Sequence, residues 1–263
     1  MLIVYVALMI AGLVGIIACQ KKQKTNPNAQ TVAFLFLIVI LVGAGGMLYE
    51  TGIFGGDREM EKIMSNEIAF AKARSKVLAD YMGKTWKGQN AVIITEPNLE
   101  QNQISKAGVA ELEAGLKAGG INVTAVEALN LPRGNGEETV PMEVALNSKV
   151  YNEIFNKYKS ANIFIITSQL PFDVKELQKL QCWKFDSKKA RVVLMNGEIY
   201  NLKAAIAQGL VGAAIAMKTG PNAYDPEKAA PKAVQAAFDT RYILVTPQNV
   251  KQIAESNKEL FAK

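Results

Sequence analysis

Polar side chains follow the apolar, β-rich runs in the C-terminal part of this sequence. The carboxyl ends of parallel strands meet at one edge of a sheet, where α/β proteins bind ligands. Hydroxyl, amide and carboxylate groups there suit a neutral polyol or sugar better than a phosphate. No Gly-x-Gly-x-x-Gly follows the first run, and no Walker lysine loop is present. The candidate ligand-binding residues are Thr95, Glu96, Asn98, Thr167, Ser168, Gln169, Asn196, Glu198, Thr246 and Asn249.

The same residue types have a second use, because Thr, Ser, Asn and Asp at these positions can cap the helix that follows a strand. Ser168 or Asp173 could cap a helix that begins at Val174, and Gln248 and Asn249 precede the closing helix. The sequence leaves ligand binding and helix capping open as alternatives.

Several catalytic chemistries are excluded, because the chain has no histidine and only two cysteines, Cys19 and Cys182. Ser-His-Asp and Cys-His nucleophile systems, histidine-ligated metals and disulfide frameworks cannot form. We therefore assign no catalytic residue, no metal and no cofactor, and expect that the chain is not an enzyme. The net charge of +6 includes three lysines in one short loop and is otherwise unclustered, so nucleic-acid binding is not indicated either.

The elements that must position these residues alternate between short apolar runs and longer amphipathic ones. Continuous apolar strands that alternate with helices predict an α/β domain, with a doubly wound, mostly parallel sheet covered on both faces. Residues 210–217 (LVGAAIAM) could extend the preceding helix or form a strand. The strands are expected at 91–95, 121–126, 162–167, 191–195 and 242–246, and the helices at 104–118, 143–159, 173–180, 202–208, 226–238 and 249–261.

The first 50 residues differ from the rest, because 1–19 and 25–49 carry no charge. A spanning helix needs about 20 apolar residues, so we predict a two-helix transmembrane hairpin. A cleaved signal peptide is the alternative for the first run, although no Lys or Arg precedes it. The predicted domains are the hairpin (1–50), a connector with an amphipathic helix (51–88) and the α/β domain (89–263).

The orientation of the hairpin follows from its charges, because Lys21, Lys22 and Lys24 lie in the short loop and short basic loops stay cytoplasmic. The N-terminus and the α/β domain are then extracytoplasmic, on a bacterial-type inner membrane.

Small residues could allow close helix packing within the membrane. They either pack the two helices together or dock a partner membrane protein. They are Ala7, Ala11, Gly15 and Gly43.

The closing section resembles a known family. The run AIAQGLVGAAIAMK, then a proline and a helix, then YILVTPQNV, is similar to the end of type I periplasmic solute-binding proteins of the ribose-binding kind. The resemblance implies that residues 210–218 form a strand and that 245–249 match the terminal motif of that family. It also implies a periplasmic-binding-like fold, here of about one lobe.

We interpret the chain as a membrane-anchored, non-enzymatic accessory or scaffold subunit of an envelope complex. Its expected partners are membrane lipid and either a membrane protein or a second copy of the chain. The alternative is a membrane-tethered solute-binding or sensor module for a small polar, sugar-like ligand. An enzyme that uses carboxylates or lysine is the third interpretation.

Overall fold

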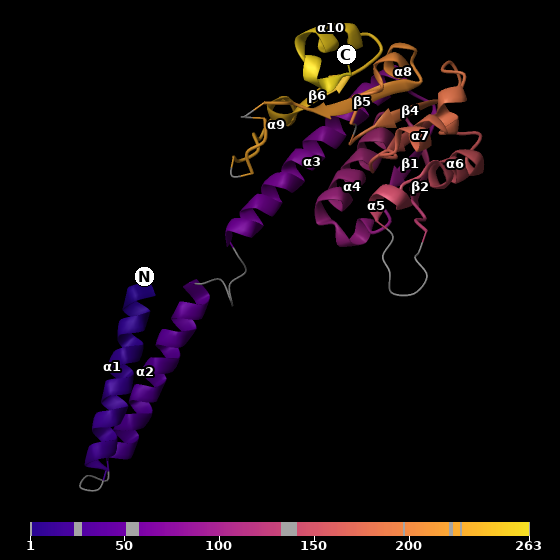
Figure 1. The fold of residues 1–263 in the computed structure, drawn as a ribbon. Coiled ribbons are helices and arrows are strands. Elements are labelled where there is room, and N and C mark those ends of the chain that lie inside the picture. The colour runs from indigo at the N-terminus through magenta and orange to yellow at the C-terminus, as the bar shows by residue number, and fades with distance from the viewer. Residues whose placement is uncertain are drawn as a thin grey trace. The chain divides into compact units, whose positions relative to one another are not determined.

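The computed structural model describes residues 2–23, 28–50, 58–132, 141–196, 198–220, 223–226 and 228–262 (Figure 1). Part of the basic loop predicted to be cytoplasmic, including Lys24, lies outside these residues. By internal contacts the chain divides into Met1–Met64, here called the hairpin unit, and Ser65–Lys263, the α/β unit. The predicted domain limits of 1–50, 51–88 and 89–263 remain predictions.

The hairpin unit contains two apolar helices, α1 (Leu2–Lys22) and α2 (Ala29–Glu50). Both are long and apolar enough to cross a membrane. They pack through glycines: a Cβ on Gly12 would lie 2.6 Å from Ile40 Cγ1, and one on Gly43 would lie 2.9 Å from Met9 Cγ. Such close approach is typical of glycine-mediated packing between membrane helices.

The predicted small residues of the hairpin divide between two faces. A Cβ on Gly15 would lie 2.6 Å from the Phe36 ring, so Gly15 belongs to the same interface as Gly43. Ala7 and Ala11 are exposed in this unit. The contact face passes through Gly12 and Gly15 rather than through the two alanines.

The α/β unit is built on a six-stranded sheet of order β2-β1-β3-β4-β5-β6 (Figure 1). The first five strands in this order pair in parallel, and β6 runs antiparallel to β5. The predicted mostly parallel α/β fold is thus confirmed. The strands are β1 (Asn90–Thr95), β2 (Asn122–Ala128), β3 (Ile163–Ile166), β4 (Arg191–Leu194), β5 (Val211–Met217) and β6 (Tyr242–Val245).

Helices cover both faces of the sheet, because alternate strand residues point to opposite sides. One core cluster joins Val92 and Phe164 to α6, α8 and α10, and the other joins Ile93 and Ile165 to α3, α4 and α9. The helices are α3 (Arg58–Thr85), α4 (Gln103–Ala118), α5 (Met142–Ala145), α6 (Ser148–Lys157), α7 (Val174–Gln178), α8 (Lys203–Ala207), α9 (Val234–Arg241) and α10 (Val250–Ser256), with short 3-10 turns η1 (Leu99–Gln101), η2 (Gln181–Lys184) and η3 (Lys258–Leu260).

Three predicted boundaries change. The helix expected over 143–159 is broken into α5 and α6, because Asn147 is extended and its side chain caps α6 by accepting from Lys149 N at 3.1 Å. The helix expected from Pro226 begins only at Val234, since Pro231 would interrupt it. The closing helix ends at Ser256 rather than at Phe261.

The ambiguous run at 210–217 is strand β5. It is buried from Val211 to Ala216, because it lies between β4 and β6 inside the sheet. Small alanine side chains let helices pack closely on both of its faces. The strand implied by the family resemblance is confirmed here.

Candidate functional site

A cavity of about 630 Å³ lies at the carboxyl edge of the sheet. Its walls come from the segments that follow β3, β4 and β5, together with one side chain of α3, the start of β6 and the C-terminal η3 turn. The parallel direction of β3, β4 and β5 brings these segments to one edge. The polar side chains that line the cavity are Arg74, Gln169, Asn196, Glu198, Tyr200, Asn201, Thr219, Tyr242 and Glu259.

Three of the sequence-predicted residues line this cavity, namely Gln169, Asn196 and Glu198. The remaining predicted residues after β1 and β3 do not. Thr95 and Thr167 are buried, and Thr167 Oγ1 donates to Ile94 O at 3.1 Å. Thr95 Oγ1 donates to Glu96 O at 3.3 Å, so both hydroxyls bond to backbone carbonyls. Glu96, Asn98 and Ser168 also lie outside the cavity lining.

Thr246 and Asn249 do not line this cavity, because they lie at the opposite edge of the sheet. Since β6 is antiparallel to β5, its last residues pair toward the beginning of β5, whereas Tyr242 pairs with Met217 at the cavity edge. The Asn249 side chain accepts from Thr246 N at 2.7 Å and donates to Leu244 O at 2.9 Å. The terminal motif thus closes a turn, far along the strand from the cavity.

Helix capping does not occupy the polar residues of the cavity. Asp173 caps α7, because its side chain accepts from Lys175 N at 2.6 Å and from Glu176 N at 3.2 Å. Leu202 stands at the cap position of α8. Gln169 and Glu198 therefore do not cap the helices that follow their strands, and their side chains are available to a ligand.

Arg74 is the main lining residue that the sequence patterns did not indicate. It comes from α3, and its Nη1 donates to the Asn196 side-chain oxygen, while Asn196 Nδ2 donates to Thr167 O at 2.6 Å. The guanidinium carbon lies 5.5 Å from the centroid of the Tyr242 ring. Burial lowers the pKa of Arg74. The available signal was an arginine between Phe70 and Val77 on the apolar stripe of the connector helix.

Apolar and aromatic side chains form the rest of the cavity lining. Phe172 and Tyr200 remain 46% and 48% exposed, and Val174 and Met217 are exposed beside them. A cavity that combines aromatic surfaces with a few polar groups is typical of small-molecule sites. These four residues thus supply apolar surface that a bound molecule could cover.

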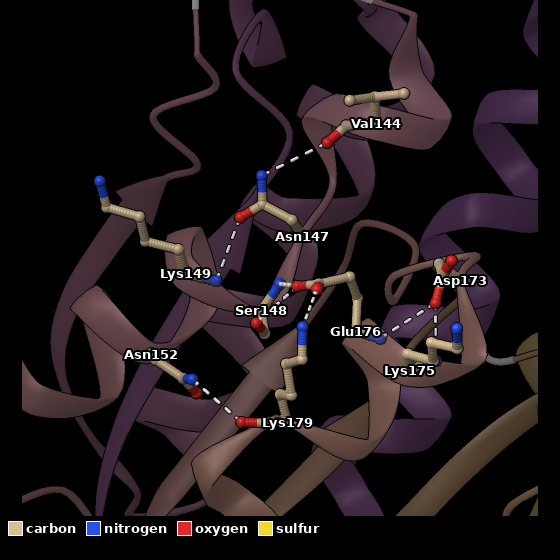
Figure 2. Close-up of polar contacts among 9 residues, drawn as sticks. All are labelled: Val144, Asn147, Ser148, Lys149, Asn152, Asp173, Lys175, Glu176 and Lys179. Carbon is tan, nitrogen blue, oxygen red and sulfur yellow. Dashed lines mark hydrogen bonds and ion pairs between the residues drawn. The ribbon is translucent and has the colours of Figure 1, made fainter.

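A polar network holds one wall of the cavity in place (Figure 2). The Glu176 carboxylate of α7 accepts from Ser148 N at 2.9 Å, from Ser148 Oγ at 2.6 Å and from Lys179 Nζ at 2.6 Å. Asn152 of α6 donates to Lys179 O at 3.1 Å. The network joins α7, whose Val174 lines the cavity, to the N-terminus of α6.

Acid is expected to weaken this network. The hydrogen bonds from Lys179 and Ser148 lower the pKa of Glu176 to about 2. A carboxylate with a depressed folded-state pKa stabilises the fold above its unfolded pKa, near 4.3, and this contribution is lost as pH falls toward 2. We expect Glu176→Gln to lower the melting temperature by a few degrees at pH 7, with a difference that shrinks between pH 4.5 and pH 2.5.

Thermal unfolding of the full chain in detergent across this pH range measures the effect. Glu113→Gln, which removes an exposed i,i+4 partner of Lys117, is the matched control and should change little. An equal difference at pH 7 and pH 2.5 for Glu176→Gln would contradict the ionised role of this carboxylate.

The structure assigns no metal or nucleophile to this site. Among the described residues, no three His, Cys, Asp or Glu side chains form a metal-binding group. Cys182 is fully buried, and burial raises the pKa of its thiol. A buried, protonated thiol is a packing residue rather than a nucleophile. The expectations of no cofactor and no enzymatic activity remain predictions.

Comparison with known proteins finds similarity in structure alone. No family model and no curated protein matches the sequence. The solved structures include a Caulobacter myo-inositol binding protein (16% identity, TM-score 0.44) and a Burkholderia graminis solute-binding protein in complex with D-arabinose (16%, 0.42). They also include a glucose-galactose binding protein from Geobacillus stearothermophilus (14%, 0.40).

The match to the myo-inositol binding protein covers 69% of this chain and 60% of that one, and the match to the D-arabinose complex covers 70% and 60%. The match to the glucose-galactose binding protein covers 73% of this chain and 57% of that one. The chain therefore spans less than two thirds of the length of these sugar-binding proteins. They are solute-binding proteins, the class that the closing section of the sequence resembles.

Proposed function

We propose that the α/β unit binds a small polar, sugar-like ligand in the cavity at the carboxyl edge of the sheet. One observation carries the proposal: a cavity of about 630 Å³ that joins amide, hydroxyl and charged groups to exposed aromatic surfaces. Its size falls within the range of about 300–1,000 Å³ that is usual for ligand sites. The accessory-subunit interpretation stays a prediction without a contact to support it.

The chemistry of the lining supports a hydroxyl-rich molecule. Gln169 and Asn201 present amides that both donate and accept, and Tyr200 adds a phenol. The faces of Phe172 and Tyr200 suit the apolar C–H face of a sugar ring. Polar groups then give orientation, while the aromatic side chains give buried area.

We further propose that the hairpin unit anchors this site to a membrane. Lys21 and Lys22 end α1, in the short connection that we expect on the cytoplasmic side. The N-terminus and the α/β unit would then be extracytoplasmic, where free solutes reach the cavity.

Ligand binding is expected to raise the melting temperature of the full-length chain in mild detergent. Mass action alone stabilises by about 2.7 kcal/mol at 100 times the dissociation constant. Thermal unfolding against a panel of monosaccharides, polyols and sugar acids measures the effect. Gln169→Ala should weaken the binding of an active compound about fivefold, because one neutral hydrogen bond contributes about 1 kcal/mol.

The matched control is Gln252→Ala, which removes the same exposed side chain from α10, away from the cavity lining. It should leave the affinity unchanged. If no compound in the panel shifts the melting temperature, or if both variants weaken binding equally, the cavity is not the site.

A further inference from the structure

The charges around the cavity are unevenly placed. Its cation, Arg74, is partly buried, whereas its two carboxylates, Glu198 and Glu259, are exposed. Glu259 already accepts a hydrogen bond from Thr219 Oγ1. The positive charge thus lies on the more buried side of the lining, and the negative charges lie on the solvent side.

Arg74 has no carboxylate partner within ion-pair distance among the residues that the structure describes. Glu67 is on the same helix, but both of its oxygens bind Arg241 Nη1, at 2.8 and 2.9 Å. The contacts of Arg74 are the Asn196 amide and the Tyr242 ring, and its Nε is buried without a hydrogen-bond partner. At contact distance its charge therefore meets a dipole and a π face, and Glu67 acts on it only from a longer distance.

A partly buried cation without a contacting counter-ion is costly, because its desolvation is not fully offset by an opposite charge. A carboxylate compensates a guanidinium best, since two parallel N–H donors match its two oxygens. The exposed Glu198 and Glu259 would repel an anionic group at the mouth of the cavity. They would instead accept hydrogen bonds from ligand hydroxyls.

We propose, on the basis of the ligand-binding function proposed above, that the ligand is a sugar acid whose carboxylate binds Arg74. Its hydroxyl groups face Gln169, Glu198 and the other exposed polar groups. Arg74 thereby favours an anionic ligand over a neutral one. The two exposed glutamates fix the orientation of the ligand, with its carboxylate toward Arg74 and its hydroxyl groups toward solvent.

Calorimetric titration of the full-length chain in mild detergent tests this selection. We compare D-glucuronate and D-galacturonate with D-glucose and D-galactose at the same pH and ionic strength. Each uronate should bind at least about tenfold more tightly than its neutral hexose, which corresponds to one charge-assisted hydrogen bond. If the hexoses bind as tightly as the uronates or more tightly, the proposed preference for a sugar acid is wrong but the ligand-binding function stands. If none of the four compounds binds, both the sugar-acid preference and the ligand-binding function are wrong.

Two variants test Arg74 itself. Arg74→Gln should remove the preference for uronates. Asn196→Asp places a carboxylate on the guanidinium, so it should weaken uronate binding about tenfold. Its second oxygen replaces the donor to Thr167 O, so the thermal unfolding of this variant is measured as well. Uronate binding that is unchanged in an Asn196→Asp variant that still unfolds cooperatively overturns the proposal.

The matched control is Arg191→Gln. Arg191 is also partly buried and lies over an aromatic ring, with its guanidinium carbon 5.1 Å from the Trp86 centroid. It begins β4 and so stands at the amino edge of the sheet, away from the cavity lining. This variant should keep the uronate preference, and loss of the preference here would overturn the assignment to Arg74.

Discussion

Replacing Glu67 with methionine is expected to lower the free energy of unfolding of the α/β unit by about 3–5 kcal/mol. Glu67 is the counter-ion of Arg241, whose side chain is only 2% exposed. The guanidinium also donates to Asp225 O at 3.0 Å and lies 3.5 Å from the centroid of Phe70. Without Glu67, this packed position holds an uncompensated charge between α3 and α9.

Urea unfolding of the full chain, followed by tryptophan fluorescence, measures this change, because both tryptophans lie in the α/β unit. Glu113→Met is the control, since it breaks an exposed pair with Lys117 that contributes less than about 1 kcal/mol.

The double variant Glu67→Met/Arg241→Met should regain most of the loss, because a well-packed apolar pair replaces a buried ion pair at little cost. If Glu67→Met costs no more than Glu113→Met, the ion pair does not hold α3 to α9.

Replacing Phe164 with alanine is expected to cost a similar amount, about 3–5 kcal/mol. Phe164 of β3 is 2% exposed, and its ring lies 5.0 Å from Phe155 and 5.7 Å from Phe185. The substitution removes this aromatic contact and leaves a cavity that the sheet and α6 cannot fill. Urea unfolding again measures the loss.

Phe172→Ala is the matched control, because it removes the same side chain from a half-exposed position on the cavity rim. It should cost less than about 1 kcal/mol. An equal loss in both variants would contradict the placement of Phe164 in the core and of Phe172 at the rim.

Much of the α/β fold could be predicted from local patterns. The runs at 91–95 and 191–195 are continuous and apolar because β1 and β4 are covered on both faces, and their strands appear within one residue of the prediction. The end of α4 at Ala118 followed from Gly119-Gly120. Gln169, Asn196 and Glu198 could be named because they follow parallel strands.

The placement of the other residues has physical reasons too. Thr246 and Asn249 follow a strand as the other candidates do, but strand direction depends on pairing across the sheet, and β6 pairs antiparallel with β5. Arg74 follows no strand, because it belongs to α3, a helix separated from Asn196 by more than a hundred residues. Its partner could not be identified without the packing of α3 on the sheet.

Local patterns were therefore enough to predict the two apolar hairpin helices, the strand–helix alternation and the polar character of the strand ends. Hydrophobic periodicity and turn chemistry act over a few residues, so one chain suffices to recognise them. The packed fold was needed to show which strand ends share a cavity and that an arginine of α3 lies among them. These contacts join residues distant in the chain, and they depend on strand direction and helix packing, which no local pattern specifies.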